Sequence, residues 1–428
     1  MTGCSSRRRP EGPAKTRMQT LERIFSEYRH WQEAHPPETR RHSAAEQLRE
    51  LGLPGARDEQ WRYANLRALD QVRDFAPAAV VPHAPELPEP LPGFARVVFI
   101  NAQPAGDLAS ALPPGVSLLP PSGQWYTLLG ADERLALLQQ LFGAEASVLR
   151  VTGSALLEIL YVAQGGGASY PALHVELAPG AHLKLIERHL GAHEPGGLIC
   201  PHVRLAIGAG AELEHYRIQS LGSASVFYDT LSVQLAEAAR YRICQVALGG
   251  ATARTSAALH LHGRGAAVDW HGLSAARDQQ VSDCRVRLDH LGQETVSTAL
   301  FRGLASSRAR VGFDGDVQVS ANAHGAKVRQ SLRGLLEGSG SEINLRPRLT
   351  IHTDQIEASH GATTGQLDEQ LLFYLLSRGL DPATARALLK SAFLGDALAA
   401  IDIAPLRRQI EQSLVAHLGD LILAGALT

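Results

Sequence analysis

The stretch LSVQLAEAARYRICQVALGGATARTSAALHLH, residues 231–262, shows what kind of fold the chain can adopt. In residues 231–235, leucine and valine alternate with serine and glutamine, which is the period-two pattern of a strand with one buried face. The small residues 237–239 give a turn signal before a second strand-like run at residues 240–248. The stretch therefore predicts short strands that are separated by tight turns.

The same pattern extends over about two hundred residues, from about residue 148 to residue 359. Its turns return at intervals of roughly 27–30 residues, a length that suits a repeat of stacked strands. We see no helical pattern inside the region. A parallel β-helix, in which each coil of the chain stacks on the preceding one, explains these features better than a β-sandwich does. On the pattern alone, a large antiparallel barrel remains the alternative.

Helical patterns precede this region. Residues 18–34 and 43–51 have apolar side chains spaced for one face of a helix. Residues 76–93 are rich in proline and predict an extended connector, and a further helix is predicted at residues 132–142.

Helical patterns also follow the region. Residues 368–377 predict a helix, and Asp381 with Pro382 gives the N-cap and first-turn signal of a second one. Pro405 interrupts the chain, and a last helix is predicted at residues 406–423.

We therefore predict a mainly β protein with helical domains at both ends. The predicted segments are a disordered extension (1–17), an N-terminal helical region with its linker (18–95), a mixed α/β connecting region (96–147), a parallel β-helix core (148–360) and a C-terminal helical domain (361–428).

Composition excludes several classes of function. The net charge of −2 argues against a dedicated nucleic-acid binder, because phosphate binding needs a basic surface. The sequence contains no run of about 18 apolar residues, so we expect no membrane span. The four cysteines have no CxxC spacing and are typical of buried thiols in a reduced compartment, so we expect a cytoplasmic protein. Residues 1–17 lack the apolar stretch of a secretory signal, and Met18 is a candidate for the translation start.

Two groups of polar residues in the strand region could carry chemistry. His260 and His262 share one face of a strand and His271 is close in sequence, but no further metal ligand is evident, so we favour exposed histidines. Asp314 and Asp316 could form the carboxylate pair of a β-helix carbohydrate-active enzyme. The region lacks aromatic platforms that bind sugars, and solvated turn acids are the interpretation that we favour.

The segment SHGATTG, residues 359–365, joins the last strand-like run to the helical tail. Adjacent residues on a strand point to opposite faces, so Ser359 and His360 make no convincing nucleophile–base pair. We expect His360 to lie exposed at a corner between sheet and helices, where a partner can reach it.

This segment, with DEQLLFYLLSRG at residues 368–379, resembles the signature of the SufB/SufD family, whose members are scaffold proteins of the SUF system for iron–sulfur cluster assembly. Two further motifs support the resemblance, namely GLP at 52–54 followed by WRY at 61–63, and FDGDV at 313–317. Together the motifs cover most of residues 18–428.

Two departures make the chain more similar to SufD members than to SufB members. Gly361 follows the histidine where SufB has glutamate, and residues 338–344 lack the cysteine that SufB carries there. Some SufD members have a cysteine where this chain has Ala358, so that thiol is not available here.

The resemblance implies a right-handed parallel β-helix between helical domains, and a non-enzymatic scaffold that forms a heterodimer with SufB and binds the ATPase SufC. It implies that His360 lies at the SufB interface as a ligand of a transient iron–sulfur cluster, with no cofactor tightly bound to the chain alone; whether a flavin takes part stays open. It also implies that the C-terminal helices bind SufC, and the residues we assign to this contact are Leu371, Leu372, Phe373, Tyr374 and Arg378.

Overall fold

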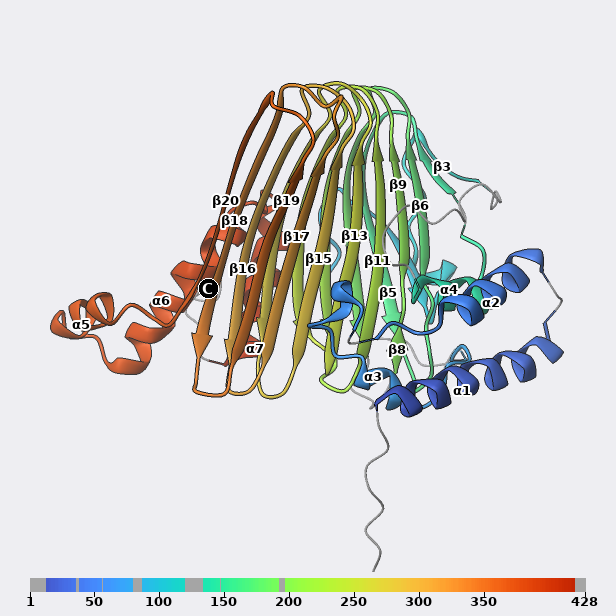
Figure 1. Ribbon diagram of the computed structural model, residues 1–428, viewed down its shortest axis with the longest axis horizontal. Helices are drawn as coiled ribbons and strands as arrows, with labels where there is room; N and C mark the ends of the chain where they lie inside the picture. The colour runs from blue at the N-terminus through green and yellow to red at the C-terminus, as the bar shows by residue number, and fades with distance from the viewer. Residues whose placement is uncertain are drawn as a thin grey trace, which may run out of the picture.

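A computed structural model of the chain describes residues 13–35, 38–55, 57–79, 87–119, 134–146, 148–191 and 197–419. Its centre is a solenoid of long strands that stack side by side, with helices at both ends (Figure 1). This confirms the predicted mainly β fold with flanking helices. The barrel alternative is wrong, because nearly all strand pairs among the described residues are parallel.

The strands form two sheets of ten. The first sheet contains, in spatial order, β2 (Gln103–Pro104), β1 (Ala95–Ile100), β5 (Ser154–Ala163), β7 (His182–Gly191), β10 (Glu212–Leu221), β12 (Arg240–Gly249), β14 (Ala267–Ala276), β16 (Val296–Ser306), β18 (Ala326–Glu337) and β20 (Ile356–Gly365). The second contains β19 (Glu342–Ile351), β17 (Arg310–Val319), β15 (Val281–His290), β13 (Thr252–Leu261), β11 (Val226–Leu235), β9 (His202–Ile207), β6 (Ala172–Leu177), β4 (Val148–Val151) and β3 (Val116–Leu119), with β8 (Leu198–Ile199) beside β11.

Helices and short helical turns lie at both ends of the solenoid (Figure 1). The part of the chain before β5 contributes α1 (Pro13–Glu33), α2 (Thr39–Leu51), η1 (Glu59–Trp61), α3 (Arg67–Asp70), η2 (Gly106–Leu108) and α4 (Ala136–Phe142). Among these, η1 reaches the last coil, where Glu59 pairs with Arg346 of β19. Beside the last coils are α5 (Glu369–Ser377), α6 (Pro382–Leu398) and α7 (Ala404–Leu418). Asp381 caps α6 as predicted, since its carboxylate accepts hydrogen bonds from the backbone N–H groups of Ala383 and Thr384.

Several predicted boundaries are corrected by the structure. Helix α1 begins at Pro13, so residues 13–17 are helical and not part of a disordered extension, while residues 1–12 lie outside the described residues. Strand β1 pairs in parallel with β5, so the first sheet starts before residue 148. At the other end β20 continues to Gly365, and the predicted boundary at residue 360 falls inside this strand.

The turns of the solenoid stack on one another, and this explains their regular spacing. The backbone N–H of Gly210 donates to the carbonyl oxygen of Glu237 in the next turn, and the N–H groups of Ala238 and Gly265 continue the series. Gly210 has a φ of 63° and Ala238 one of 53°, a left-handed conformation that glycine adopts without strain. The position in the turn, and not the residue type alone, therefore fixes the conformation.

Alternate residues of each strand face the interior, where they form the core. Leu231, Val233 and Leu235 are at most 1% exposed, as their alternation predicts. Further along, the rings of Phe301 and Phe313 stack at a centroid distance of 4.5 Å, which joins the two sheets by apolar contact. Burial of such side chains stabilises each by roughly 1.5–3 kcal/mol relative to exposure.

A charged cluster interrupts this core in the middle of the solenoid. Arg217 donates hydrogen bonds to Asp229 at 2.7 Å and to Glu187 at 2.8 Å, and the ring of His215 lies 3.0 Å from Glu187. Burial alone would raise the pKa of Glu187, but the Arg217 guanidinium and the hydrogen bonds with His189 and His215 together outweigh it, and the pKa lies well below its usual range. The sequence pattern did not predict this cluster.

His290 makes the packing testable through pH. Its buried ring lies 2.8 Å from the hydroxyl oxygens of Thr295 and Ser297, and burial lowers its pKa to about 4. A histidine in the unfolded chain has a pKa near 6.5, so the stability contributed by the neutral ring is complete above that pH and is lost as the pH falls through 4. We expect this group to lower the free energy of unfolding by up to roughly 3 kcal/mol over that range.

The measurement is urea unfolding at stepwise pH values, for the wild type and for His290→Gln. The variant should show a smaller decline of stability between pH 6.5 and pH 4, because its amide does not titrate. Equal declines in the two proteins would contradict this assignment.

Candidate functional site at the open end of the solenoid

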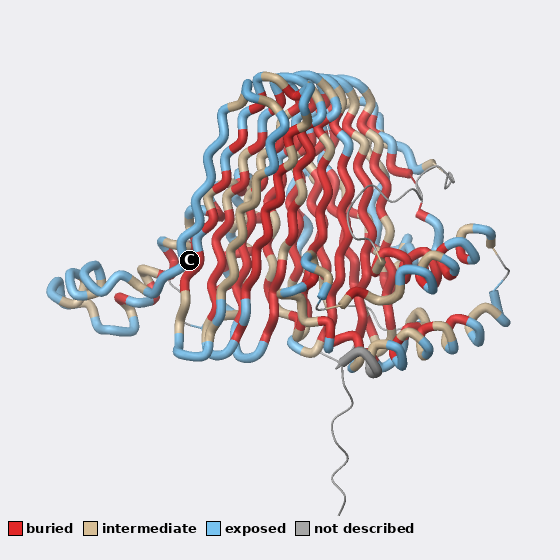
Figure 2. Tube along the Cα trace, viewed as in Figure 1, coloured by how far each residue is buried: buried red, intermediate tan, exposed pale blue. Residues whose placement is uncertain are grey.

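The last coil leaves both sheets with a free edge. Strands β19 and β20 end their sheets, and no described strand pairs with their outer edges. Along β20 the chain is exposed over most of its length, in contrast to the buried central strands (Figure 2). A free edge presents unpaired N–H and C=O groups, which form a template for a strand of another chain.

Apolar side chains that would be core in an inner coil are only partly covered here. Ile343, Leu345 and Leu349 of β19 pack against the core on one side and stay half-buried. Ile351 is 40% exposed. The interior of the solenoid is therefore open at this end, and an apolar partner surface could bury it.

His360 lies in the middle of β20, in register with Gln330 of β18. It therefore does not sit at the predicted corner between sheet and helices, although it is exposed as expected. On β18, Val328 and Leu332 face the core, so alternation places His360 on the same inward face, at the open end. Ser359 lies on the opposite face, in line with the prediction that the two residues form no nucleophile–base pair.

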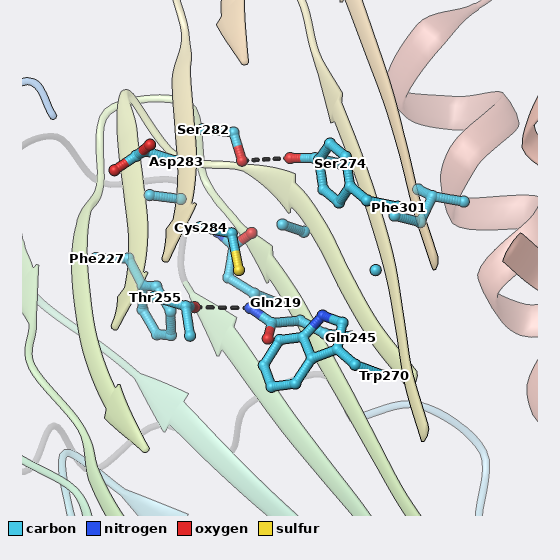
Figure 3. A pocket seen from close by; sticks show the side chains of 14 residues that line it. Gln219, Phe227, Gln245, Thr255, Trp270, Ser274, Ser282, Asp283, Cys284 and Phe301 are labelled. Carbon is cyan, nitrogen blue, oxygen red and sulfur yellow. Dashed lines mark hydrogen bonds between the residues drawn. The ribbon is translucent and has the colours of Figure 1, made fainter. Parts of the chain in front are cut away.

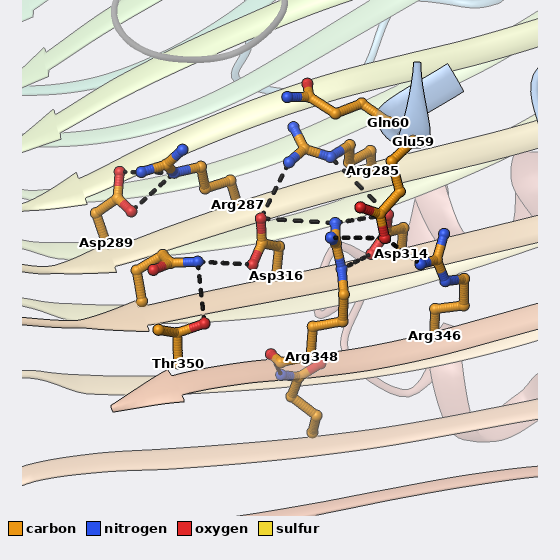
Figure 4. Close-up of polar contacts among 12 residues, drawn as sticks. Glu59, Gln60, Arg285, Arg287, Asp289, Asp314, Asp316, Arg346, Arg348 and Thr350 are labelled. Carbon is orange, nitrogen blue, oxygen red and sulfur yellow. Dashed lines mark hydrogen bonds and ion pairs between the residues drawn. The ribbon is translucent and has the colours of Figure 1, made fainter. Parts of the chain in front are cut away.

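Asp314 and Asp316 are engaged in ion pairs on the outer face of β17 (Figure 4). Arg348 donates two hydrogen bonds to Asp314, at 2.8 and 2.9 Å, and Arg285 donates to Asp316 at 3.0 Å. Both carboxylates are buried, so the prediction of solvated turn acids is wrong. Burial raises the pKa of Asp314 although Arg348 opposes the shift. These carboxylates are held by arginines and face no sugar-binding cleft, so nothing in the geometry favours the carbohydrate-active alternative.

Of the three histidines considered as metal ligands, His260 and His262 are neighbours, with ring centroids 5.9 Å apart, but His271 does not join them. His260 lies 3.0 Å from a carboxylate oxygen of Asp289 on the second sheet, whereas His271 belongs to β14 of the first sheet and lies 2.9 Å from Asp269. Within the described ranges, no group of three or more histidine, cysteine or acidic side chains could hold a metal ion.

The described cysteines are free and lie far from the open end in sequence. Cys200 and Cys244 are buried, and Cys284 lines a small pocket of about 20 Å³, together with Trp270 and Gln245 (Figure 3). Burial raises the pKa of each thiol, to about 12 for Cys244. Cys200 and Cys244 are thus buried thiols, as predicted, Cys284 is only partly buried, and Cys4 lies outside the described residues.

A second exposed apolar surface is formed by α5. Phe373 is 72% exposed, Tyr374 53% and Leu371 51%, while Leu372 is half-buried. The Arg378 guanidinium lies 5.2 Å from the centre of the Tyr374 ring. Figure 1 shows α5 projecting away from the solenoid. Three large apolar side chains that are exposed to solvent on one short helix are typical of a binding surface.

Ion pairs tie the adjacent helix α6 to the first sheet. Lys390, only 1% exposed, lies 3.0 Å from Glu337 at the end of β18, and Arg302 of β16 lies 3.0 Å from Asp396. Helix α5 is therefore carried by an element that is fixed to the last coils.

The geometry defines a solenoid with a free strand edge at its last coil and an exposed apolar surface on α5. Residues 160–393 match the family described as SUF system FeS cluster assembly, SufBD core domain, and the chain belongs to this family. The chain is 24% identical to the iron–sulfur cluster assembly protein SufD of Escherichia coli, over 91% of this chain and 94% of that protein. It is 28% identical to a SufBD family protein of Synechocystis, over 87% of this chain and 89% of that one. A SufD of Plasmodium berghei is 26% identical over 57% of this chain but only 18% of its own length.

The family is a scaffold family and not a known catalytic one. No described helix is long and apolar enough to cross a membrane.

The ion pair of Arg348 with Asp314 can be tested by mutation. Arg348→Gln would leave a buried carboxylate without its bidentate partner, and we expect a loss of about 2 kcal/mol in the free energy of unfolding. The control is the double variant with Asp314→Asn, which removes the unpaired charge and should recover part of the loss in urea unfolding. A single variant as stable as wild type would show that the pair contributes nothing.

Proposed function

We propose that the chain is a non-enzymatic scaffold subunit of the SUF system, which pairs with SufB through its last coil and binds the ATPase SufC through α5. The observation that carries the proposal is the open end, where free strand edges and half-buried apolar residues occur together. An open coil of this kind is completed most economically by the similar coil of a paralogous chain. The cytoplasmic location stays a prediction.

The cargo of the complex would be a nascent iron–sulfur cluster that His360 helps to hold. A neutral imidazole is a suitable iron ligand, and this one is exposed on the inward face of the last strand. The last coil, residues 342–365, contains no cysteine, so this chain would supply one nitrogen ligand while thiolates come from SufB. A flavin in the complex stays a prediction, and we assign no residue to it.

Co-purification tests the proposal most directly. The chain, co-expressed with SufB and SufC from the same organism, should elute with both in size-exclusion chromatography. A chain that elutes alone when both partners are present would overturn the proposed function.

His360→Ala should leave the complex assembled but lower its content of iron and acid-labile sulfide, because one cluster ligand is lost. The matched control is Ser359→Ala, which changes the neighbouring side chain on the opposite face of the same strand. Iron and sulfide would be measured in the purified complex after reconstitution, together with the absorbance of the cluster. Equal cluster content in the two variants would exclude His360 as a ligand.

Phe373→Asp should weaken SufC binding roughly tenfold or more, because it places a charge at the most exposed apolar position of α5. Glu369→Ala in the first turn of the same helix is the control, since it leaves the apolar surface intact. Affinity would be measured by isothermal titration calorimetry, and circular dichroism would verify the fold. Leu372→Asp tests instead the half-buried side of α5, where we expect loss of folding of the helix. Wild-type affinity of Phe373→Asp would contradict the assignment of α5 to SufC.

A further inference from the structure

Charges alternate across the outer face of the second sheet as it approaches its free edge. These outward positions lie between inward ones such as Phe313 and Val317, which are buried in the core. In two adjacent rows of the register a cation on β15 is followed by an anion on β17 and by a cation on β19; the rows are Arg285–Asp314–Arg346 and Arg287–Asp316–Arg348.

On β17 the charged residues have oppositely charged residues on both neighbouring strands, whereas on β19 they have them on one side only. Asp316 lies 3.0 Å from Arg285 on one side and 3.6 Å from Arg348 on the other, so it has cations on both flanking strands (Figure 4). Beyond β19 no described strand follows. Arg346 is paired at 2.8 Å with Glu59 of η1, whose side chain is 65% exposed. The guanidinium also lies 5.3 Å from the centre of the Tyr63 ring. A pair with so exposed a carboxylate is weak, so a carboxylate of a partner could take the place of Glu59.

Pro347 lies between the two edge arginines and weakens backbone pairing there. The N–H groups of Glu342 and His352 donate to β17, at the carbonyl oxygens of Ala309 and Val319. In a parallel strand, the backbone N–H and C=O groups of alternate residues face opposite neighbouring strands. The backbone of residue 347 therefore faces the free edge and not β17. Proline has no N–H, and the free edge therefore lacks one donor in its middle. Recognition at this point must come from the flanking side chains.

We propose that the strand which pairs with β19 carries two carboxylates, two positions apart, that face Arg346 and Arg348. The inference rests on the proposed pairing with SufB and adds the chemistry of the partner strand. The added strand then extends both rows to cation, anion, cation, anion. Opposite charges on neighbouring strands stabilise a sheet, and across an interface close charge pairs also determine which partner is accepted.

The same arrangement disfavours a second copy of this chain. If two β19 edges paired antiparallel about an axis near Pro347, Arg346 of each copy would lie opposite Arg348 of the other. Like charges directly opposite one another destabilise a strand pair. Charge thus selects for an acidic partner strand and against self-association in this register.

The test is a charge swap in the complex with SufB from the same organism. Arg346→Glu should lower the association constant roughly tenfold or more, and wild-type affinity should fall as ionic strength rises. Each acidic residue on the terminal strands of SufB is then changed to lysine in turn. One of these variants should bind Arg346→Glu better than it binds the wild type. Arg29→Glu, the same reversal at an exposed position of α1, should bind like the wild type.

The outcomes separate the two proposals. Suppose that the wild type binds SufB, but that Arg346→Glu binds equally well or that no lysine variant restores affinity. The proposal of an acidic partner strand is then wrong, whereas the proposed pairing with SufB is retained. If the wild type does not bind SufB, both proposals fall. Circular dichroism and thermal unfolding of each variant show whether a loss of affinity comes from a loss of fold. Should Arg346→Glu unfold, Arg346→Gln takes its place, with a smaller loss of affinity and a weaker salt dependence expected.

Discussion

The structure depends on backbone hydrogen bonding between successive coils. Each inner strand has a neighbour on both sides, so its N–H and C=O groups are satisfied and its inward side chains are covered. A stack of this kind has to end, and its two ends are different. At the start, the two-residue strand β2 and the antiparallel strand β3 end the sheets, and α2 and α4 lie at the same end of the solenoid as β3 (Figure 1). At the other end β19 and β20 are full length, and no described strand pairs with their outer edges. This difference between the ends is the reason for placing the proposed partner strand at the last coil.

Much of this fold could be predicted from the sequence because each coil of the solenoid needs the same pattern of strand and turn residues. The alternation in residues 231–235 arises because one face of the strand points inward, and the turns recur because they stack on one another. The extent of β20 could not be predicted in this way. Residues 361–365, GATTG, have no apolar alternation and lie at an exposed end, and they are extended because they pair with residues 331–335 of β18. Tertiary pairing sets their structure, and local propensity does not.

The polar sites show the same limit. Asp314 and Asp316 resemble solvated turn acids in sequence, because the arginines that bury them come from other strands: Arg285 is about thirty residues before Asp314 and Arg348 about as far after it. The cluster of Glu187, Arg217 and Asp229 was missed for the same reason. Glu187 and Arg217 are one coil apart in sequence, whereas Asp229 follows Arg217 by 12 residues, on the facing sheet. In a solenoid, residues one repeat apart are neighbours, so a search at that spacing would have found the arginine–aspartate pairs and the pair of Glu187 with Arg217, but not Asp229.

The two proposed surfaces are mechanically connected through α6. Its Lys390 is almost fully buried and paired with Glu337, at the end of the strand that carries β20 on its outer edge. Breaking this pair costs free energy, because the ammonium group of Lys390 is buried and would lose a carboxylate partner, although Glu337 itself is 34% exposed. A movement of α6 that leaves β18 in place would have to meet this cost, together with that of separating Asp396 from Arg302. It costs less for α6 and the last strands to move together. A force applied to α5 would therefore act on the coil in which His360 lies.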